Sequence, residues 1–126
     1  MAGQRILIVD DNPINLKLAR LILDSEGYVV ATADDAEQAL TTLQELAPAL
    51  ILMDLQLPGM DGLTLVRKLR DDARWNQTWI IAFTAYAMKG DEEKALAAGC
   101  DGYVTKPIDP DKLLGVVSGF LARSRP

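Results

Sequence analysis

The chain has no histidine, a single cysteine and no apolar run longer than a strand requires. Without histidine, no imidazole can serve as an acid, a base or a metal ligand, and the chain cannot carry a phosphohistidine of its own. Cys100 has no partner for an internal disulfide, which indicates a reducing compartment. Its position after residues 96–99, rich in alanine and glycine, predicts a small buried side chain rather than a reactive thiol.

Basic clusters are also missing, because lysine and arginine never occur in runs longer than a pair. With 18 acidic against 13 basic residues the net charge is −5, so we expect no direct binding to DNA. No segment has the length and apolar character of a membrane-spanning helix, and residues 1–5 lack the apolar core of a signal peptide. These absences predict a cytoplasmic protein with no membrane partner.

The composition predicts one domain over residues 1–126, since 49% of the residues are apolar and this length suits a single core. Five short apolar runs are typical of strands, and segments with helical spacing separate them. The first run is apolar throughout, as expected for a parallel strand covered on both faces. The predicted strands span residues 6–9, 28–33, 50–53, 79–83 and 102–105.

Helical spacing predicts five helices. The first has a cap candidate at Asn12 and ends at Gly27. The fourth, residues 89–98, is alanine-rich and only weakly amphipathic, and with Gly90 near its start it is a candidate soft element. In the first, second, third and fifth helices we expect these inward-facing residues: Ile14, Leu18, Leu21 and Ile22; Ala36, Ala39, Leu40, Leu43 and Ala47; Leu65, Val66 and Leu69; Leu113, Leu114, Val117, Phe120 and Leu121.

The alternation of strands and helices predicts an α/β fold of the (βα)5 type. Right-handed crossovers favour the flavodoxin-like strand order 2-1-3-4-5, with a parallel sheet between two layers of helices. In this order the first and third strands are neighbours, so Asp10, Asp11 and Asp54 should meet at the carboxyl edge where the winding reverses. Thr84 and Lys106 should reach the same edge from the fourth and fifth strands.

A group of carboxylates with no histidine beside it suits a hard, oxygen-loving cation. A lysine and a threonine at the same edge are what an incoming phosphoryl group would need. The pattern therefore predicts phosphoryl transfer onto a carboxylate.

Four motifs, in order and at matching spacings, resemble the receiver domain of two-component response regulators. They are residues 8–12 (IVDDN), 52–62 (LMDLQLPGMDG), 83–85 (FTA) and 103–107 (YVTKP). The resemblance covers essentially the whole chain and implies the CheY-like form of the fold. Residues 85–91 are further similar to single-domain regulators of the DivK type and to receivers attached to hybrid histidine kinases.

The resemblance implies a role for the acidic residues. Asp54 matches the phosphoacceptor, on which a transferred phosphoryl group forms an acyl phosphate. Asp11, Asp54 and the backbone carbonyl of Gln56 match the Mg²⁺ ligands, with Asp10 beside the ion.

The resemblance also implies a switch. Lys106 matches the lysine that pairs with the phosphoryl group and, before phosphorylation, with Asp54; its bond to Pro107 is cis in the family. Thr84 matches the hydroxyl residue that binds the phosphoryl group, and Tyr103 matches the aromatic residue that turns inward when Thr84 moves. The face formed by the fourth helix, the fifth strand and the fifth helix would then change and be recognised by a downstream protein.

The phosphoryl donor implied by the resemblance is a histidine kinase or a histidine phosphotransfer protein that docks over the first helix. The chain would be a signalling domain rather than an enzyme, catalysing only its own phosphorylation and the hydrolysis of its own acyl phosphate. Ala85 would leave room for the phosphate, and Tyr86 would slow hydrolysis by hindering water. Trp75 and Trp79 are expected in the core or at its edge.

Other interpretations remain open. Asp10 and Asp11 also suit a helix-capping pair, Thr84 an ordinary strand residue, and Tyr103 a partly exposed aromatic residue with no switching role. A receiver that never takes phosphate, a metal-dependent phosphohydrolase or a flavodoxin-like cofactor binder would share the fold. The complete set of acidic residues and lysine disfavours the first, and the acidic, glycine-free turn at residues 10–13 disfavours a flavin-phosphate cradle.

Overall fold

One parallel sheet organises the chain. The computed structural model describes residues 3–57, 59–84 and 90–123. The strand order is β2-β1-β3-β4-β5, so the predicted (βα)5 chain and its topology are confirmed. The strands are β1 (Arg5–Val9), β2 (Val29–Ala33), β3 (Leu50–Met53), β4 (Trp79–Thr84) and β5 (Gly102–Thr105), and the helices are α1 (Pro13–Asp24), α2 (Ala36–Glu45), α3 (Gly62–Arg70), α4 (Asp91–Ala98) and α5 (Pro110–Leu121).

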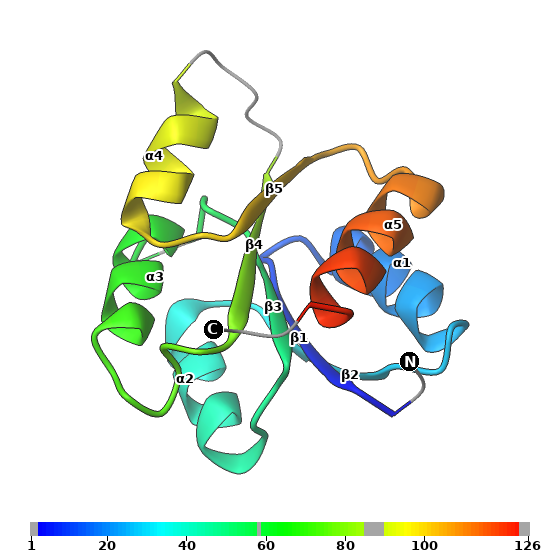
Figure 1. Ribbon diagram of the computed structural model, residues 1–126, viewed down its shortest axis with the longest axis horizontal. Helices are drawn as coiled ribbons and strands as arrows, with labels where there is room; N and C mark the ends of the chain where they lie inside the picture. The colour runs from blue at the N-terminus through cyan, green and yellow to red at the C-terminus, as the bar shows by residue number, and fades with distance from the viewer. Residues whose placement is uncertain (1–2, 58, 85–89, 124–126) are drawn as a thin grey trace.

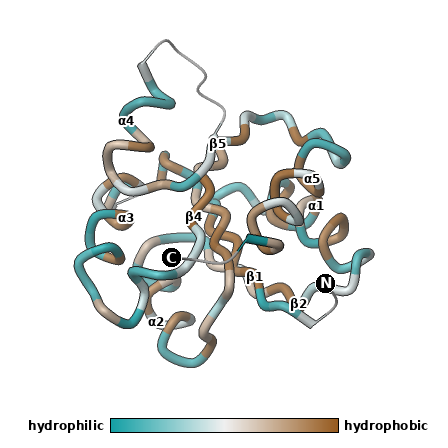
Figure 2. Tube along the Cα trace, in the orientation of Figure 1, coloured by the Kyte–Doolittle hydropathy of each residue, from teal (hydrophilic) through white to brown (hydrophobic). Residues whose placement is uncertain are grey.

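Helices cover both faces of the sheet (Figure 1). α1 and α5 lie on one face, and α2, α3 and α4 lie on the other. Side chains alternate along each strand, so β1 sends Leu7 and Val9 to the α2–α3–α4 side and Ile6 and Ile8 to the α1–α5 side. Apolar residues follow the central strands, and polar residues follow the outer surfaces of the helices (Figure 2). The result is a three-layer sandwich with a core on each side of the sheet.

The predicted inner face of α1 is wrong for three of its four residues, since only Ile22 packs against the core. Ile14, Leu18 and Leu21 are exposed, by 74%, 43% and 59%, whereas Ala19 and Leu23 are buried. The helix carries two apolar stripes at helical spacing, and periodicity alone cannot choose between them. The Asn12 side chain accepts hydrogen bonds from the N–H groups of the first turn, as predicted for a cap. The helix that follows turns the stripe containing Ala19 and Leu23 toward the sheet.

Two other helix predictions need correction. α2 ends at Glu45 and leaves Ala47 exposed, because the chain is already extended before Pro48. α4 begins at Asp91 rather than at residue 89. Residue 89 lies outside the described residues, as do Ala85 and Tyr86, so the expectations for these two stay predictions.

The core expectations for the remaining residues hold. Cys100 is 5% exposed, and burial raises the pKa of its thiol to about 12, which agrees with an unreactive structural side chain. Trp75 is buried, and Trp79 is partly buried at the start of β4, with its ring centroid 5.2 Å from that of Phe120. In the described part of the chain, no helix combines the length and apolar character needed to cross a bilayer.

Gly62 brings α3 against the end of β3. A Cβ atom at this position would contact the carbonyl oxygen of Asp54 and would lie 2.6 Å from the Cα of Leu55. Both neighbours are backbone atoms, which cannot rotate away. The close approach lets the Gly62 N–H donate to the Leu55 carbonyl at 3.1 Å and fixes the loop that follows Asp54.

We predict that Gly62→Ala lowers the free energy of unfolding by about 1–3 kcal/mol, because α3 must move away from the backbone of the β3–α3 loop. The matched control is Gly119→Ala on α5, where an added Cβ would meet nothing within 4 Å. There the substitution should stabilise by about 0.5–1 kcal/mol, since alanine is the better helix former. Urea unfolding measures both, and equal effects would contradict the packing argument.

Candidate functional site

The site forms where β1 and β3 end side by side. The Asp54 N–H donates to the Val9 carbonyl at 2.8 Å, and the Asp10 N–H donates to the Ala33 carbonyl at 3.0 Å. These bonds continue the ladders of the sheet by one residue, so both aspartates leave the sheet with fixed backbones. This is the point of reversed winding at which open α/β sheets place their ligand sites.

Three carboxylates converge there, as the sequence predicts. Oxygen atoms of Asp10, Asp11 and Asp54 all lie within 4.8 Å of one another. Asp10 and Asp54 are buried, whereas Asp11 is exposed and opens the cluster to solvent. The side chains surround a cavity of about 220 Å³ lined by Asp10, Asp11, Asn12, Asn15, Asp54, Gln56 and Lys106.

Lys106 reaches the acidic pair from the end of β5. Its Nζ lies 2.5 Å from Oδ2 of Asp10 and 3.2 Å from Oδ2 of Asp54. The pairing expected with Asp54 is therefore present, but Asp10 is the nearer partner. Oδ2 of Asp10 is fully buried, and the Lys106 ammonium is its close ion-pair partner.

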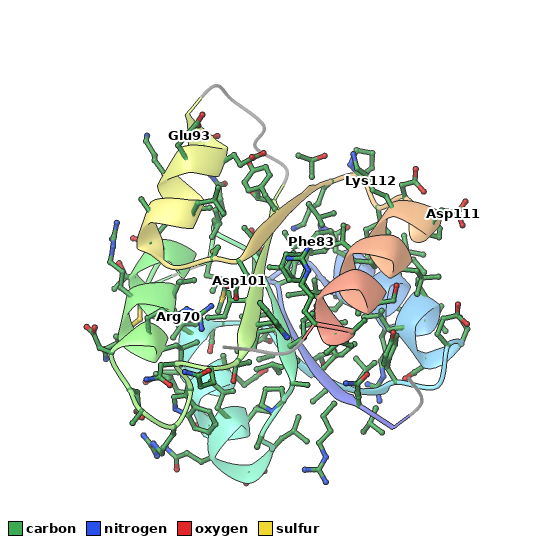
Figure 3. The ribbon with its side chains drawn as sticks, viewed as in Figure 1. Arg70, Phe83, Glu93, Asp101, Asp111 and Lys112 are labelled. Carbon is green, nitrogen blue, oxygen red and sulfur yellow. The ribbon has the colours of Figure 1, made fainter. Side chains whose placement is uncertain are left out.

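Two further contacts and a cis peptide bond position this lysine. Its N–H donates to the Thr84 carbonyl at 2.8 Å, and its bond to Pro107 is cis, as the resemblance implied. The Nζ atom lies 5.0 Å from the ring centroid of Phe83, which is fully buried at the centre of the molecule (Figure 3). An aromatic face attracts a cation at this distance. The ammonium is thus enclosed by two carboxylates and one ring.

Burial dominates the acidity of Asp54. Desolvation raises the pKa of its carboxyl group to about 6, the Gln56 N–H and Lys106 oppose this change, and the neighbouring Asp10 adds to it. The Gln56 N–H donates to Oδ1 at 2.9 Å, while Oδ2 faces Lys106. At neutral pH the Asp54 carboxyl group is therefore mostly ionised, although burial makes its charged form less favourable than it would be in water.

The net negative charge of the cluster favours binding of a divalent cation. Three carboxylates and one ammonium line the described part of the cavity, so the site carries two excess negative charges when all four groups are ionised. All the candidate ligands are oxygen atoms, which hard cations prefer. The donor set therefore fits Mg²⁺.

Thr84 and Tyr103 lie beside this cavity rather than in it. They line a second cavity of about 310 Å³ together with Leu55, Gln56, Leu63, Asp91 and Lys94. Gln56 borders both spaces. Thr84 is 1% exposed and Tyr103 is partly buried, and the two candidate switch residues line one cavity next to the acidic cluster.

Sequence reasoning missed Asn15 and Phe83. Asn15 lines the acidic cavity from the first turn of α1. Its distance of three residues from the Asn12 cap was the available signal, because this spacing places both on one side of the helix. Phe83 reads as an ordinary apolar strand residue, and no pattern in the sequence indicates that its ring meets Lys106.

Comparisons with known proteins agree with this geometry. A family model described as "Response regulator receiver domain" matches residues 6–118. The polar-differentiation response regulator DivK of Brucella anthropi is 39% identical over 116 residues, which cover 92% of this chain and 94% of that protein. DivK of Brucella ovis gives the same identity and coverage.

Solved structures show the same likeness. A putative response regulator from Chloroflexus aurantiacus superposes with a TM-score of 0.91 at 31% identity, covering 96% of this chain and 99% of that one. The receiver domain of a sensor histidine kinase from Pseudomonas aeruginosa, solved with a magnesium ion coordinated in its active site cleft, gives a TM-score of 0.88 at 36% identity, with coverage of 97% and 100%. Fold, site geometry and relatives agree that this chain belongs to the response regulator receiver domain family of two-component signalling.

Proposed function

We propose that Asp54 is the phosphoacceptor of this receiver and that residues 1–126 act as one phosphorelay domain. The observation that carries the proposal is a buried carboxylate at the end of β3, 3.2 Å from a lysine ammonium and within 4.8 Å of two further carboxylates. An aspartate that only caps a turn at a strand end would not need a neighbouring ammonium group and two further carboxylates. The domain signals through its own phosphorylation and acts on no other substrate.

In this proposal a carboxylate oxygen of Asp54 attacks the phosphorus of a phosphohistidine on the donor protein. The P–N bond breaks, its electron pair stays on the imidazole, and an acyl phosphate forms on Asp54. The Gln56 N–H holds Oδ1 and Lys106 faces Oδ2, so the carboxylate is oriented before the donor arrives. Lys106 then pairs with the transferred phosphoryl oxygens.

Asp11, Asp54 and the backbone carbonyl of Gln56 would hold Mg²⁺, with Asp10 beside it. When bound, the ion neutralises charge on the phosphoryl group and on the carboxylates. The support lies in the excess negative charge and the all-oxygen donor set of the cavity. Asp10 already engages Lys106, which fits a role in balancing charge next to the ion.

Thr84 and Tyr103 would carry the signal away from Asp54. Phosphorylation draws the Thr84 hydroxyl toward the new phosphoryl oxygens, and Tyr103 turns into the space that Thr84 leaves. The cavity of about 310 Å³ that they share supplies the room for this movement. The face formed by α4, β5 and α5 then presents a different surface to a downstream protein rather than to DNA or a membrane.

The donor, a histidine kinase or a histidine phosphotransfer protein, would dock on the exposed α1 strip, formed by Ile14, Leu18 and Leu21. Such a contiguous apolar surface marks a site of protein contact. Asn15, on the same helix, lines the acidic cavity, so a partner seated on the strip lies next to Asp54. We place the domain in the cytoplasm, because a kinase-fed receiver must share the compartment that supplies ATP.

The central prediction is that Asp54→Asn abolishes phosphorylation, because an amide cannot form the acyl phosphate. Acetyl phosphate with Mg²⁺ should add one phosphoryl group to the unaltered chain and none to the variant, as measured by intact-mass spectrometry. Asp71→Asn, an exposed aspartate at the end of α3, is the control and should label normally. A phosphoryl group on Asp54→Asn would contradict the assignment.

A second prediction concerns pH in the absence of divalent metal. The folded pKa of Asp54 is about 6 against an ordinary value of 3.8, so the folded state binds the proton more tightly than the unfolded state. The free energy of unfolding should therefore fall as pH rises through this window. Asp54→Asn should be the more stable protein at about pH 7 by about 1–3 kcal/mol, and the difference should vanish near about pH 4.

Urea unfolding in the presence of a chelator measures this difference across the pH range. Added Mg²⁺ should stabilise the unaltered chain and leave Asp54→Asn nearly unchanged, since a ligand that binds only the folded state raises its stability. A difference that does not vary with pH would contradict the burial argument.

A third prediction separates docking from chemistry. Leu18→Ser should slow transfer from a cognate phosphohistidine protein about tenfold, because the lost apolar contact is worth roughly 1.4 kcal/mol or more. Labelling by acetyl phosphate should not change. Leu96→Ser on α4 is the matched control, since Leu96 is 45% exposed and Leu18 is 43% exposed. Equal slowing in the two variants would contradict docking on the α1 strip.

A further inference from the structure

Arg70, the last residue of α3, binds the corner where α4 turns into β5. Its Nε donates to the Gly99 carbonyl at 2.8 Å. One Nη2 contact, at 2.6 Å, pairs it with Oδ2 of Asp101. In Figure 3 the two labelled side chains point toward each other across the corner. The planar guanidinium thus binds Gly99 and Asp101, at the two ends of the connection between α4 and β5.

The same guanidinium also binds the connection between α3 and β4. Its Nη1 donates to the carbonyls of Asn76 at 3.1 Å and Thr78 at 2.7 Å. Oδ2 of Asp101 accepts a second hydrogen bond, from the Ile80 N–H at 2.9 Å. One partly buried ion pair therefore ties together α3, the start of β4 and the end of α4.

Gly99 lets the backbone come this close. It has a φ of +121°, and a Cβ atom there would lie 2.6 Å from Cγ of Arg70. The carboxyl end of α4 is therefore packed directly on the arginine side chain. We call this arrangement, made by Arg70, Gly99 and Asp101, the corner clamp.

The amino end of α4 is held differently. Its N-cap is Gly90, which has no side chain to accept from the first-turn N–H groups. The buried residues of the helix are Ala95 and Ala98, both in its second half and both small. Glu92 and Glu93 are exposed, and Figure 3 shows Glu93 on the outer side of the helix. Within the described residues, α4 is thus tied to Arg70 at its carboxyl end and buries no side chain in its first turn.

The amino end of α4 borders the space that would sense phosphorylation. Asp91 and Lys94 line the cavity shared by Thr84 and Tyr103, whereas the corner clamp lies at the opposite end of α4. A change in that cavity acts on the amino end of the helix first. Displacement of the whole helix would require breaking the bonds of Arg70.

We propose that Arg70 is a positioning residue of the switch: it fixes the carboxyl end of α4 as a pivot, so that phosphorylation swings the amino end of the helix. The inference rests on the proposed phosphorylation of Asp54. It identifies the amino end of α4 as the part of the face formed by α4, β5 and α5 that moves. The α4 surface near Glu93 then changes with phosphorylation, and the surface near Gly99 does not.

Distance measurements between spin labels test the pivot. One protein carries labels at Glu93→Cys and Ser118→Cys, and a second carries them at Ala97→Cys and Ser118→Cys. Residue 118, on α5, is the common reference for both distances. All three positions are exposed, while the native Cys100 is buried and its raised pKa keeps it unlabelled. Beryllofluoride with Mg²⁺ serves as the phosphoryl mimic.

We expect the distance from residue 93 to shift by about 2 Å on activation and the distance from residue 97 to stay constant. In Arg70→Gln both distances should shift. Arg67→Gln, an exposed arginine one turn earlier on α3, is the matched control and should behave as the unaltered chain. Arg70→Lys keeps the charge without the forked hydrogen bonds and should also release residue 97, so the test survives if Arg70→Gln does not fold.

Equal shifts at both positions in the unaltered chain, or no shift at either, would overturn the pivot. An Arg70 variant in which residue 97 stays fixed would overturn the role of the clamp. Fluorine magnetic resonance reports binding of beryllofluoride independently. If the mimic does not bind, the proposed function fails and the inference fails with it; if it binds and the shifts are not asymmetric, only the inference fails.

Discussion

The structure depends on one electrostatic conflict: three carboxylates share a small cavity with one ammonium group. The ladders of β1 and β3 bring the aspartates together, because Asp10 and Asp54 continue those strands by one residue. Burial makes the negative charges expensive, as the raised pKa of Asp54 shows. Lys106 offsets part of this cost, and a bound divalent cation would offset more of it.

Most of the fold could be predicted, because parallel strands that are buried on both faces appear in the sequence as short runs of apolar residues. β1 is apolar after Arg5 and β3 is apolar throughout, so both stand out in the sequence. The inner face of α1 could not be predicted, since two apolar stripes fit one helical period. The stripe chosen for the core is lined with Ala19 and Leu23, and the rejected one carries the larger exposed side chains. Large apolar residues on a helix therefore do not always face the core, and here the exposed stripe lies on the same helix as Asn15, which lines the acidic cavity.

The candidate site was predictable to the extent that it sits at the ends of strands. Strand order alone brought Asp10, Asp11, Asp54 and Lys106 to one edge. Distances within that edge were not predictable: Lys106 lies nearer to Asp10 than to Asp54, and Thr84 lines a neighbouring space. Phe83 could not be identified at all, because a buried aromatic residue and a cation-binding ring look identical in a sequence.

The distribution of packing around the sheet suits the two partners that we propose for this domain. Gly62 packs the loop after Asp54 against backbone, and the corner clamp ties the carboxyl end of α4, so the proposed phosphorylation site and the proposed pivot both have well-packed surroundings. Between them, the first turn of α4 buries no side chain and borders the cavity that Thr84 and Tyr103 line. In the proposed switch, a rigid frame around this turn converts a local change of charge into movement of the turn, because packed cores shift between discrete arrangements rather than deform evenly. The α1 strip lies on the other side of the sheet from α4, whereas α5, which also belongs to the proposed output face, packs beside α1, so only the α4 part of that face is remote from the proposed donor surface.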